Sequence, residues 1–151
     1  MVRLCPASIV GPLGADHEGG AITALHWGRD GTLAEGPLAD RLAAELAAYF
    51  AGTLEAFTVP LRPRGGAFQQ AFYAALCAIP FGETRTYGQL ATTLGVSAQA
   101  IGQACGANPI PILIPCHRVV GAAGLGGYSG PGGIETKVAL LRHEGAAGLL
   151  I

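Results

Sequence analysis

The sequence predicts a mixed α/β (α+β) fold with a small N-terminal lobe and a mainly helical C-terminal lobe. The weak apolar alternation typical of a half-buried strand occurs near the N-terminus, while amphipathic helical periodicity dominates the later part of the chain. Between them, residues 53–66 are rich in proline and glycine, as expected of a connection. We therefore expect a shortened N-terminal lobe with a short antiparallel sheet over residues 1–62. A C-terminal domain over residues 63–151 should contain a helix-turn-helix and a loop that carries a cysteine.

The N-terminal lobe is expected to hold a two-stranded sheet and one helix. Residues 21–27, AITALHW, alternate weakly and end before the turn sequence GRDG, and residues 2–10 are the expected partner strand. Residues 37–52 predict a helix, because apolar side chains recur every three or four positions between Pro37 and Gly52. Its apolar positions are Leu38, Leu42, Leu46, Tyr49 and Phe50.

Three helices are expected in the first half of the C-terminal domain. Residues 67–79 repeat the amphipathic pattern, and a break at Pro80–Gly82 precedes a short helix over residues 87–94. After a glycine turn, Ser97 is a suitable N-cap for a helix over residues 98–106. Helix, turn and second helix form the outline of a helix-turn-helix, although a core-packed hairpin has the same outline. The residues expected to face inward are Phe68, Phe72, Leu76, Ile79, Ile101, Ala104 and Cys105.

The rest of the chain combines irregular segments with one last helix. Gly106 is expected to cap the preceding helix, and the prolines that follow exclude further helix before residue 116. Residues 112–114, ILI, read as a short buried strand, and residues 121–133 read as a glycine-rich loop. The final helix, within residues 134–145, should face inward with Ile134, Val138 and Leu141.

Composition and charge restrict the class of protein. The chain has 151 residues, is 50% hydrophobic and has a mean hydropathy of +0.42, which excludes a disordered protein. Residues 1–60 carry three arginines against seven acidic residues, whereas residues 61–151 carry six basic and three acidic residues. This mild asymmetry permits a polyanionic partner, but it is far below that of a dedicated nucleic-acid binder. No apolar run is long enough for a membrane span, and no signal peptide is recognisable, so we expect a cytoplasmic location.

The four cysteines lack the spacing of a metal-binding motif. No pair has CxxC spacing, and no cysteine–histidine set has zinc-finger spacing. Cys77 and Cys105 lie among small apolar residues and are expected to be buried as small hydrophobes. A site that combines Cys5 with His17 or His26 stays open as an alternative, but the expectation is that no metal is bound.

The fourth cysteine has a different setting, in the sequence IPCHRVV. Cys116 follows a proline and precedes His117 and Arg118. A thiol is a poor nucleophile until a base or a positive charge makes its thiolate available, and an adjacent imidazole is such a base. Glu144 could orient this imidazole in the manner of a triad. The competing interpretation is a structural cysteine beside a surface histidine.

The segment NPIPILIPCHRVVG resembles the active-site signature of the O6-alkylguanine-DNA alkyltransferases, the methylated-DNA–protein-cysteine methyltransferases. The similarity continues through IPFGETRTYGQLA, GGYSG and LLRHEG, so it covers roughly residues 66–145. The resemblance implies a monomeric protein without a cofactor that binds double-stranded DNA through the minor groove. It implies that the damaged guanine is flipped into a pocket and that its alkyl group moves from O6 to the cysteine, where it stays. O4-alkylthymine is a possible further substrate.

The resemblance also assigns roles to individual residues. The catalytic set that it implies is Cys116 as alkyl acceptor, His117 and Glu144 as the relay, Tyr87 as hydrogen-bond donor to the base and Asn108 as hinge. The implied base pocket comprises Val119, Tyr128, Ser129 and Arg118. The implied DNA-binding residues are Gln99, Ala98, Ala100, Gly102 and Arg85.

One position departs from the family pattern. The family has an arginine in the second helix of the helix-turn-helix, which fills the space that the flipped base leaves, and the corresponding residue here is Gln99. Glutamine keeps hydrogen-bonding groups but loses the charge and some of the reach. Two alternatives therefore remain: a lesion-binding sensor with weak or no transfer on duplex DNA, and a thiol-dependent enzyme that acts on small or single-stranded substrates.

Overall fold

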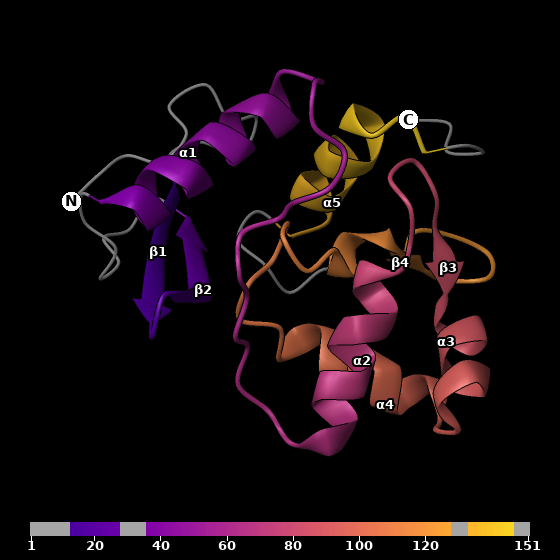
Figure 1. The fold of residues 1–151 in the computed structure, drawn as a ribbon. Helices are drawn as coiled ribbons and strands as arrows, with labels where there is room; N and C mark the ends of the chain where they lie inside the picture. The colour runs from indigo at the N-terminus through magenta and orange to yellow at the C-terminus, as the bar shows by residue number, and fades with distance from the viewer. Residues whose placement is uncertain (1–12, 28–35, 128–132, 147–151) are drawn as a thin grey trace. The chain divides into compact units, whose positions relative to one another are not determined.

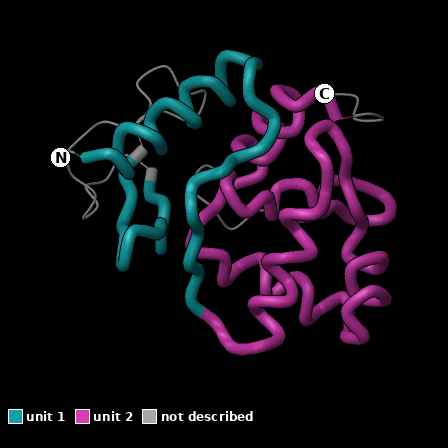
Figure 2. The backbone as a smooth tube through the Cα atoms, viewed as in Figure 1, with its two compact units in different colours: residues 1–64 teal, residues 65–151 magenta. Residues whose placement is uncertain are grey.

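The computed structural model describes residues 13–27, 36–127 and 133–146 (Figure 1). The chain divides into two compact units, residues 1–64 and 65–151 (Figure 2). The division falls at Arg64 and Gly65, inside the proline- and glycine-rich connection. Among the described residues, a small antiparallel sheet and helices make up the predicted mixed α/β class.

The first unit contains an antiparallel hairpin of strands β1 (Leu13–Glu18) and β2 (Ala21–Trp27). The strand predicted at residues 21–27 is confirmed. Its partner in the structure is β1, a segment whose charged and small residues give no apolar alternation, and residues 2–10 lie outside the described residues. The connection forms a single parallel bridge with β2, since Ile22 exchanges backbone hydrogen bonds of 2.9 and 2.8 Å with Pro60 and Arg62.

Helix α1 (Pro37–Phe50) is the other element of this unit, and it confirms the predicted helix. Leu42, Leu46 and Tyr49 are fully buried, as their spacing predicts, because i, i+4 and i+7 share one helix face. The Glu45 carboxylate on α1 accepts a 2.8 Å hydrogen bond from the backbone amide of Thr58. The hydrogen bond to Glu45 therefore holds the connection against α1.

The second unit begins with α2 (Ala67–Cys77), the short strand β3 (Arg85–Thr86), α3 (Tyr87–Leu94) and α4 (Ala98–Gly106). The three helices pack against one another (Figure 1). Two expectations for α2 are wrong: Phe68 in its first turn is 38% exposed, and Cys77 in its last turn is exposed. Both residues lie at helix ends, where few neighbours remain to cover them. The predicted inward residues Phe72, Leu76 and Ile79 are buried.

Helices α3 and α4 form the predicted helix-turn-helix. Gly95 ends α3 with a φ of 69°, a left-handed conformation that glycine adopts without steric cost. Ser97 then caps α4, because its hydroxyl accepts a 3.1 Å hydrogen bond from the amide of Ala100. The prediction that Gly106 caps α4 is wrong, since Gly106 is the last helical residue and Ala107 takes the cap position in a right-handed conformation.

The chain from Ile110 to the cysteine is buried but is not a strand. The prediction of a strand at residues 112–114 is wrong, because Ile112 has a φ of 76° and only an isolated bridge joins Pro111 to Ile114. A single 3-10 turn, Cys116–Arg118, follows, and then β4 (Val119–Val120), which pairs in parallel with β3.

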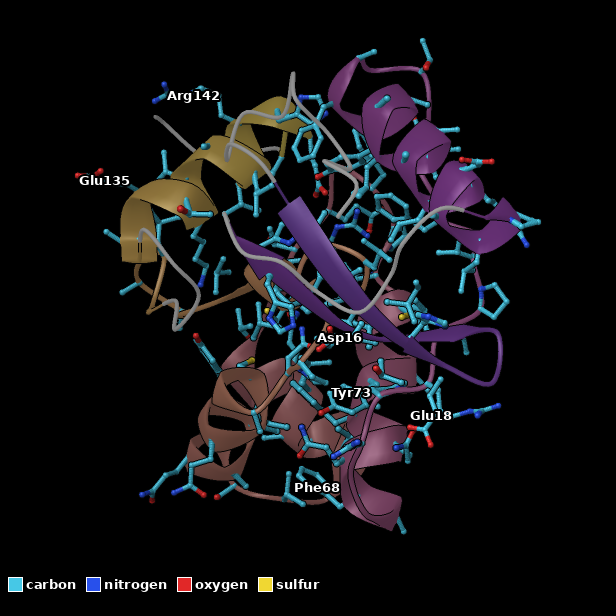
Figure 3. All side chains as sticks on the ribbon, turned by 90° about the vertical axis from the view of Figure 1, so that its left-hand side faces the viewer. Asp16, Glu18, Phe68, Tyr73, Glu135 and Arg142 are labelled. Atoms are coloured by element: carbon cyan, nitrogen blue, oxygen red, sulfur yellow. The ribbon has the colours of Figure 1, made fainter. Side chains whose placement is uncertain are left out.

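Helix α5 (Gly133–His143) closes the described part of the second unit. Its inner face consists of Lys137, Leu140 and Leu141, which confirms the prediction for Leu141. Val138 is half-buried and Ile134 is 41% exposed, so the rest of the predicted inner face is rotated from the actual one. The cause is Lys137, a cation that occupies a core position. Glu135 and Arg142 project outward from α5 (Figure 3). None of the helices in the described ranges has the length and apolarity needed to cross a membrane.

Candidate active site

The 3-10 turn places three adjacent polar side chains in the interior. Pro115 precedes the turn, and Cys116, His117 and Arg118 are all buried, with His117 fully inaccessible. Burial of an imidazole and a guanidinium is costly unless both find partners. Glu144, which follows α5, supplies the partner for both.

Glu144 accepts three short hydrogen bonds. The Nε2 atom of His117 lies 2.9 Å from its Oε2, and Arg118 donates from Nε to Oε1 at 2.8 Å and from the terminal guanidinium to Oε2 at 2.9 Å. Arg118 also donates to the carbonyl of Ile79 at 2.7 Å. The two hydrogen bonds from the Arg118 guanidinium fix the Glu144 carboxylate, and the carboxylate in turn fixes the plane of the His117 imidazole.

The protonation states follow from these contacts. Burial acts to raise the pKa of Glu144, but hydrogen bonds from His117 and Arg118 outweigh it and lower this pKa to about 2. Burial lowers the pKa of His117, although the hydrogen bond to Glu144 opposes this shift. A neutral imidazole beside an ionised carboxylate donates its proton from Nε2. The lone pair therefore lies on Nδ1, which is buried and has no protein partner within the described residues.

Cys116 is buried, but 8% of its surface remains exposed. Burial raises the pKa of its thiol, whereas a hydrogen bond from the Asn108 side chain and the positive charge of Lys137 act to lower it. The resting sulfur is thus a protonated thiol in a setting that contains a base, a hydrogen-bond donor and a cation.

Asn108 holds the loop that leads to the cysteine. Its amide nitrogen donates to the carbonyl of Ile114 at 2.9 Å, and its side-chain oxygen accepts from the amide of Ile110 at 3.0 Å. Between these anchors, Ile112 adopts the left-handed conformation, which is costly for a β-branched residue. Because Asn108 directly follows the C-cap of α4, the helix-turn-helix and the cysteine loop are joined through one side chain.

Lys137 is a buried cation near Cys116 that the sequence did not predict as part of the site. Its ammonium is fully buried and donates to the carbonyls of Val119 and Leu125, both at 2.6 Å, and of Gly127 at 3.0 Å. Burial lowers its pKa, and nearby Cys105 and Cys116 oppose this shift. Lys137 therefore ties β4 to the glycine-rich loop and brings a positive charge close to the sulfur of Cys116.

Tyr87 lies against this loop. The ammonium of Lys137 is 5.9 Å from the centre of its ring, and a Cβ on Gly126 would come within 2.8 Å of the ring. Gly126 also has a φ of 72°, so this position requires glycine for both space and conformation. Burial raises the pKa of Tyr87, and the phenol stays protonated at neutral pH.

The residues predicted to bind DNA are exposed or half-buried. On α4, Ala98, Gln99 and Gly102 are exposed and Ala100 is half-buried. Arg85 on β3 donates to Glu83 at 3.1 Å and to the carbonyl of Thr84 at 2.9 Å, with 37% of its side chain exposed.

Of the four residues predicted to line the base pocket, two are buried and two lie outside the described residues. Tyr128 and Ser129 lie outside the described residues. Arg118, expected to contact the base, instead uses its guanidinium to hold Glu144 and the carbonyl of Ile79. Val119 is fully buried, and its carbonyl accepts from Lys137.

The alternative metal site receives no support from the described histidines. Within the described ranges, no three histidine, cysteine or acidic side chains are grouped as metal ligands would be. His26 instead lies 2.8 Å from the carboxylate of Asp16 across the hairpin. Cys5 lies outside the described residues.

Comparison with known proteins agrees with the geometry of the second unit. Residues 67–146 match the sequence profile described as the 6-O-methylguanine DNA methyltransferase, DNA binding domain. The chain belongs to this methyltransferase family. A family member from Mycobacterium leprae, named methylated-DNA–protein-cysteine methyltransferase, is 42% identical over 147 residues, which cover 91% of this chain and 88% of the relative.

Other family members extend the comparison. The Mycobacterium tuberculosis protein of the same name is 53% identical over 103 residues, and this match spans 66% of the chain but only 61% of that relative. The crystal structure of Mycobacterium tuberculosis OGT in complex with DNA superposes with a TM-score of 0.79 and 42% identity, over 91% of this chain and 88% of that one. The fold of the methyltransferase family therefore extends over both units of the chain.

Proposed function

We propose that this protein repairs O6-alkylguanine in DNA by moving the alkyl group to its own Cys116, once per molecule. The observation that carries the proposal is the buried set of Cys116, His117 and Glu144. The ionised carboxylate of Glu144 orients the neutral imidazole of His117. The lone pair of this imidazole lies on the buried Nδ1 atom, and His117 directly follows Cys116 in the sequence. A structural cysteine needs no such base.

The reaction is a single displacement. His117 Nδ1, directly or through a water molecule, takes the thiol proton of Cys116, and the thiolate attacks the alkyl carbon. The sulfur–carbon bond forms while the bond between that carbon and guanine O6 breaks. The guanine leaves with the electron pair and takes up one proton from water, while His117 releases the former thiol proton to water. Tyr87 donates a hydrogen bond to the leaving guanine. The product thioether has no good leaving group, so water does not regenerate the thiol.

Each supporting residue has a role in this scheme. Glu144 stabilises the imidazolium that forms, and Arg118 fixes Glu144, so Arg118 acts as a positioning residue. Asn108 holds the cysteine loop, and its side chain acts to lower the pKa of the Cys116 thiol. The base pocket in this proposal is lined by Val119, Tyr128 and Ser129.

DNA binding is assigned to the helix-turn-helix, with α4 in the minor groove of the duplex and the protein acting as a monomer. Ala98, Ala100 and Gly102 leave the α4 backbone free to approach the groove closely, and Arg85 lies close to the start of α3. Gln99 occupies the gap that the flipped base leaves. Because α4 carries no charge, we expect weak DNA affinity and slow repair relative to a protein with arginine at this position.

The mass of the protein after incubation with a lesion duplex tests the proposal. A gain of one CH2 unit after incubation with O6-methylguanine in double-stranded DNA is the expected result. Binding of the same duplex without a gain in mass would instead indicate a lesion sensor, the reading that the uncharged Gln99 favours. Transfer from the free base or a single strand, but not from the duplex, would indicate a thiol-dependent enzyme on small substrates.

A further inference from the structure

The outer face of α4 carries two glutamine side chains with no partner. Gln99 and Gln103 are both exposed, and neither side-chain amide makes a hydrogen bond within the described residues. Glutamines elsewhere in the second unit are used internally: Gln69 binds the carbonyl of Ala104, Gln70 that of Gly65, and Gln89 completes the capping box of α3. The two amides on α4 are therefore available to an external partner.

Their spacing matches the spacing of bases. Residues four apart lie about 6 Å apart along a helix axis. Successive base pairs are separated by about 3.4 Å, so the two amides are about two base steps apart when the helix lies along a groove. Gly102 lies between them, and a Cβ built on it would meet no atom of the protein within 4 Å. Ile101 and Ala104 anchor the opposite face of α4 in the core, so the backbone positions of Gln99 and Gln103 are fixed on the exposed face.

The chemistry of a glutamine amide favours one kind of base pair. In the minor groove an A·T pair presents only acceptors, whereas a G·C pair adds the N2 amino donor of guanine. Glutamine Oε1 can accept from this amino group while Nε2 donates to a neighbouring acceptor. On an A·T pair only the donation is possible, and the side-chain oxygen loses its water without gaining a partner.

We propose that Gln103 reads the base pairs beside the lesion and makes the protein prefer a G·C pair at one neighbouring step. This inference rests on the proposed minor-groove position of α4. Gln99 enters the gap at the lesion itself, so it acts on every lesion equally. Gln103, one turn further along the helix, gives the dependence on sequence context.

Affinity measurements test the proposal independently of catalysis. The full chain with Cys116→Ala, which cannot accept an alkyl group, is titrated with O6-methylguanine duplexes that differ at the first and second steps on either side of the lesion. Each of these positions carries a G·C, an A·T or an inosine·C pair, because inosine lacks only the N2 amino group. We expect binding about fivefold tighter for G·C than for inosine·C at one position, the effect of one net hydrogen bond.

Two variants in the same background make the test specific. Gln103→Ala should bind all of these duplexes with equal affinity, while Gln70→Ala, an exposed glutamine on α2, should keep the preference. Equal binding of G·C and inosine·C duplexes by the parent protein, or a preference that survives Gln103→Ala, would overturn the inference.

Methyl transfer by the unmodified protein separates this inference from the proposed function. Context-dependent binding that depends on Gln103, without any transfer, would support the inference and contradict the repair function. Transfer together with context-independent binding would support repair and refute the role of Gln103.

Discussion

Adding one methyl group to α4, by Gly102→Ala, should stabilise the protein and weaken its binding to DNA. In the free protein the new Cβ meets no atom within 4 Å, so it causes no clash. Replacing a glycine inside a helix by alanine is worth about 1 kcal/mol, because it reduces the entropy of the unfolded chain. For a chain of this length such a gain raises Tm by about 2–4 °C.

The effect on DNA binding has the opposite sign. Gly102 lies on the exposed face of α4, which we assign to the minor groove, and a methyl group there separates the two surfaces. Overpacking a close contact costs about 1–3 kcal/mol, so duplex affinity should fall by about tenfold. Thermal unfolding measures the first effect, and fluorescence anisotropy with a lesion duplex measures the second.

Two controls make this experiment decisive. Gly88→Ala, in the first turn of α3, adds a Cβ 3.8 Å from the hydroxyl of Thr86, an ordinary contact, so it should also stabilise the protein while leaving duplex affinity unchanged. Reaction of Gly102→Ala with free O6-benzylguanine should proceed at the parent rate. Unchanged duplex affinity in the stabilised Gly102→Ala protein would refute the assignment of this face of α4 to DNA.

Three further predictions concern other parts of the site. Gln99→Arg should speed transfer from a lesion duplex by about tenfold through a charge-assisted contact and leave the rate with free O6-benzylguanine unchanged; equal effects on both substrates in single-turnover kinetics would refute the role of Gln99. Lys137→Met leaves the buried carbonyl of Val119 unpaired, at about 1–3 kcal/mol, and removes the donor from two part-buried carbonyls, so Tm should fall by several degrees, and an unchanged Tm would show that the lysine does not hold the loop. The pKa of Glu144 is lowered from 4.5 to about 2, so its contribution of about 3 kcal/mol is complete above pH 4.5 and is lost as the pH falls towards 2. Urea unfolding at several pH values should show this loss, and Glu144→Gln should remove it.

The helix-turn-helix and the proposed nucleophile could be predicted because neighbouring residues specify them. Gly95 supplies the left-handed residue that ends α3, and Ser97 supplies the cap that begins α4, so both boundaries follow from neighbouring residues alone. Cys116 and His117 are likewise neighbours in the sequence. Features that depend only on neighbouring residues can therefore be predicted from the sequence.

The parts that sequence reasoning missed depend on contacts between distant segments. A lysine in an amphipathic helix normally indicates the solvent side, so nothing in the α5 sequence shows that Lys137 is buried. Its three acceptors are backbone carbonyls 10 to 18 residues earlier in the chain. Every residue has such a carbonyl, so the sequence does not show which ones accept a hydrogen bond from the lysine. The prediction of a strand at residues 112–114 is wrong for a related reason. These residues are as apolar as a buried strand, but hydrogen bonds with Asn108 hold the backbone in a turn.

The site and number of alkyl groups on the protein test the central claim most directly. After exhaustive reaction with O6-methylguanine duplex, peptide mass mapping should find one methyl group per protein, on Cys116, with one guanine repaired. Cys105 is a useful internal comparison, because burial raises its pKa to about 12 and it should stay unmodified. Methylation at Cys105 or Cys77, or more than one guanine repaired per protein molecule, would contradict a single-use transfer to Cys116.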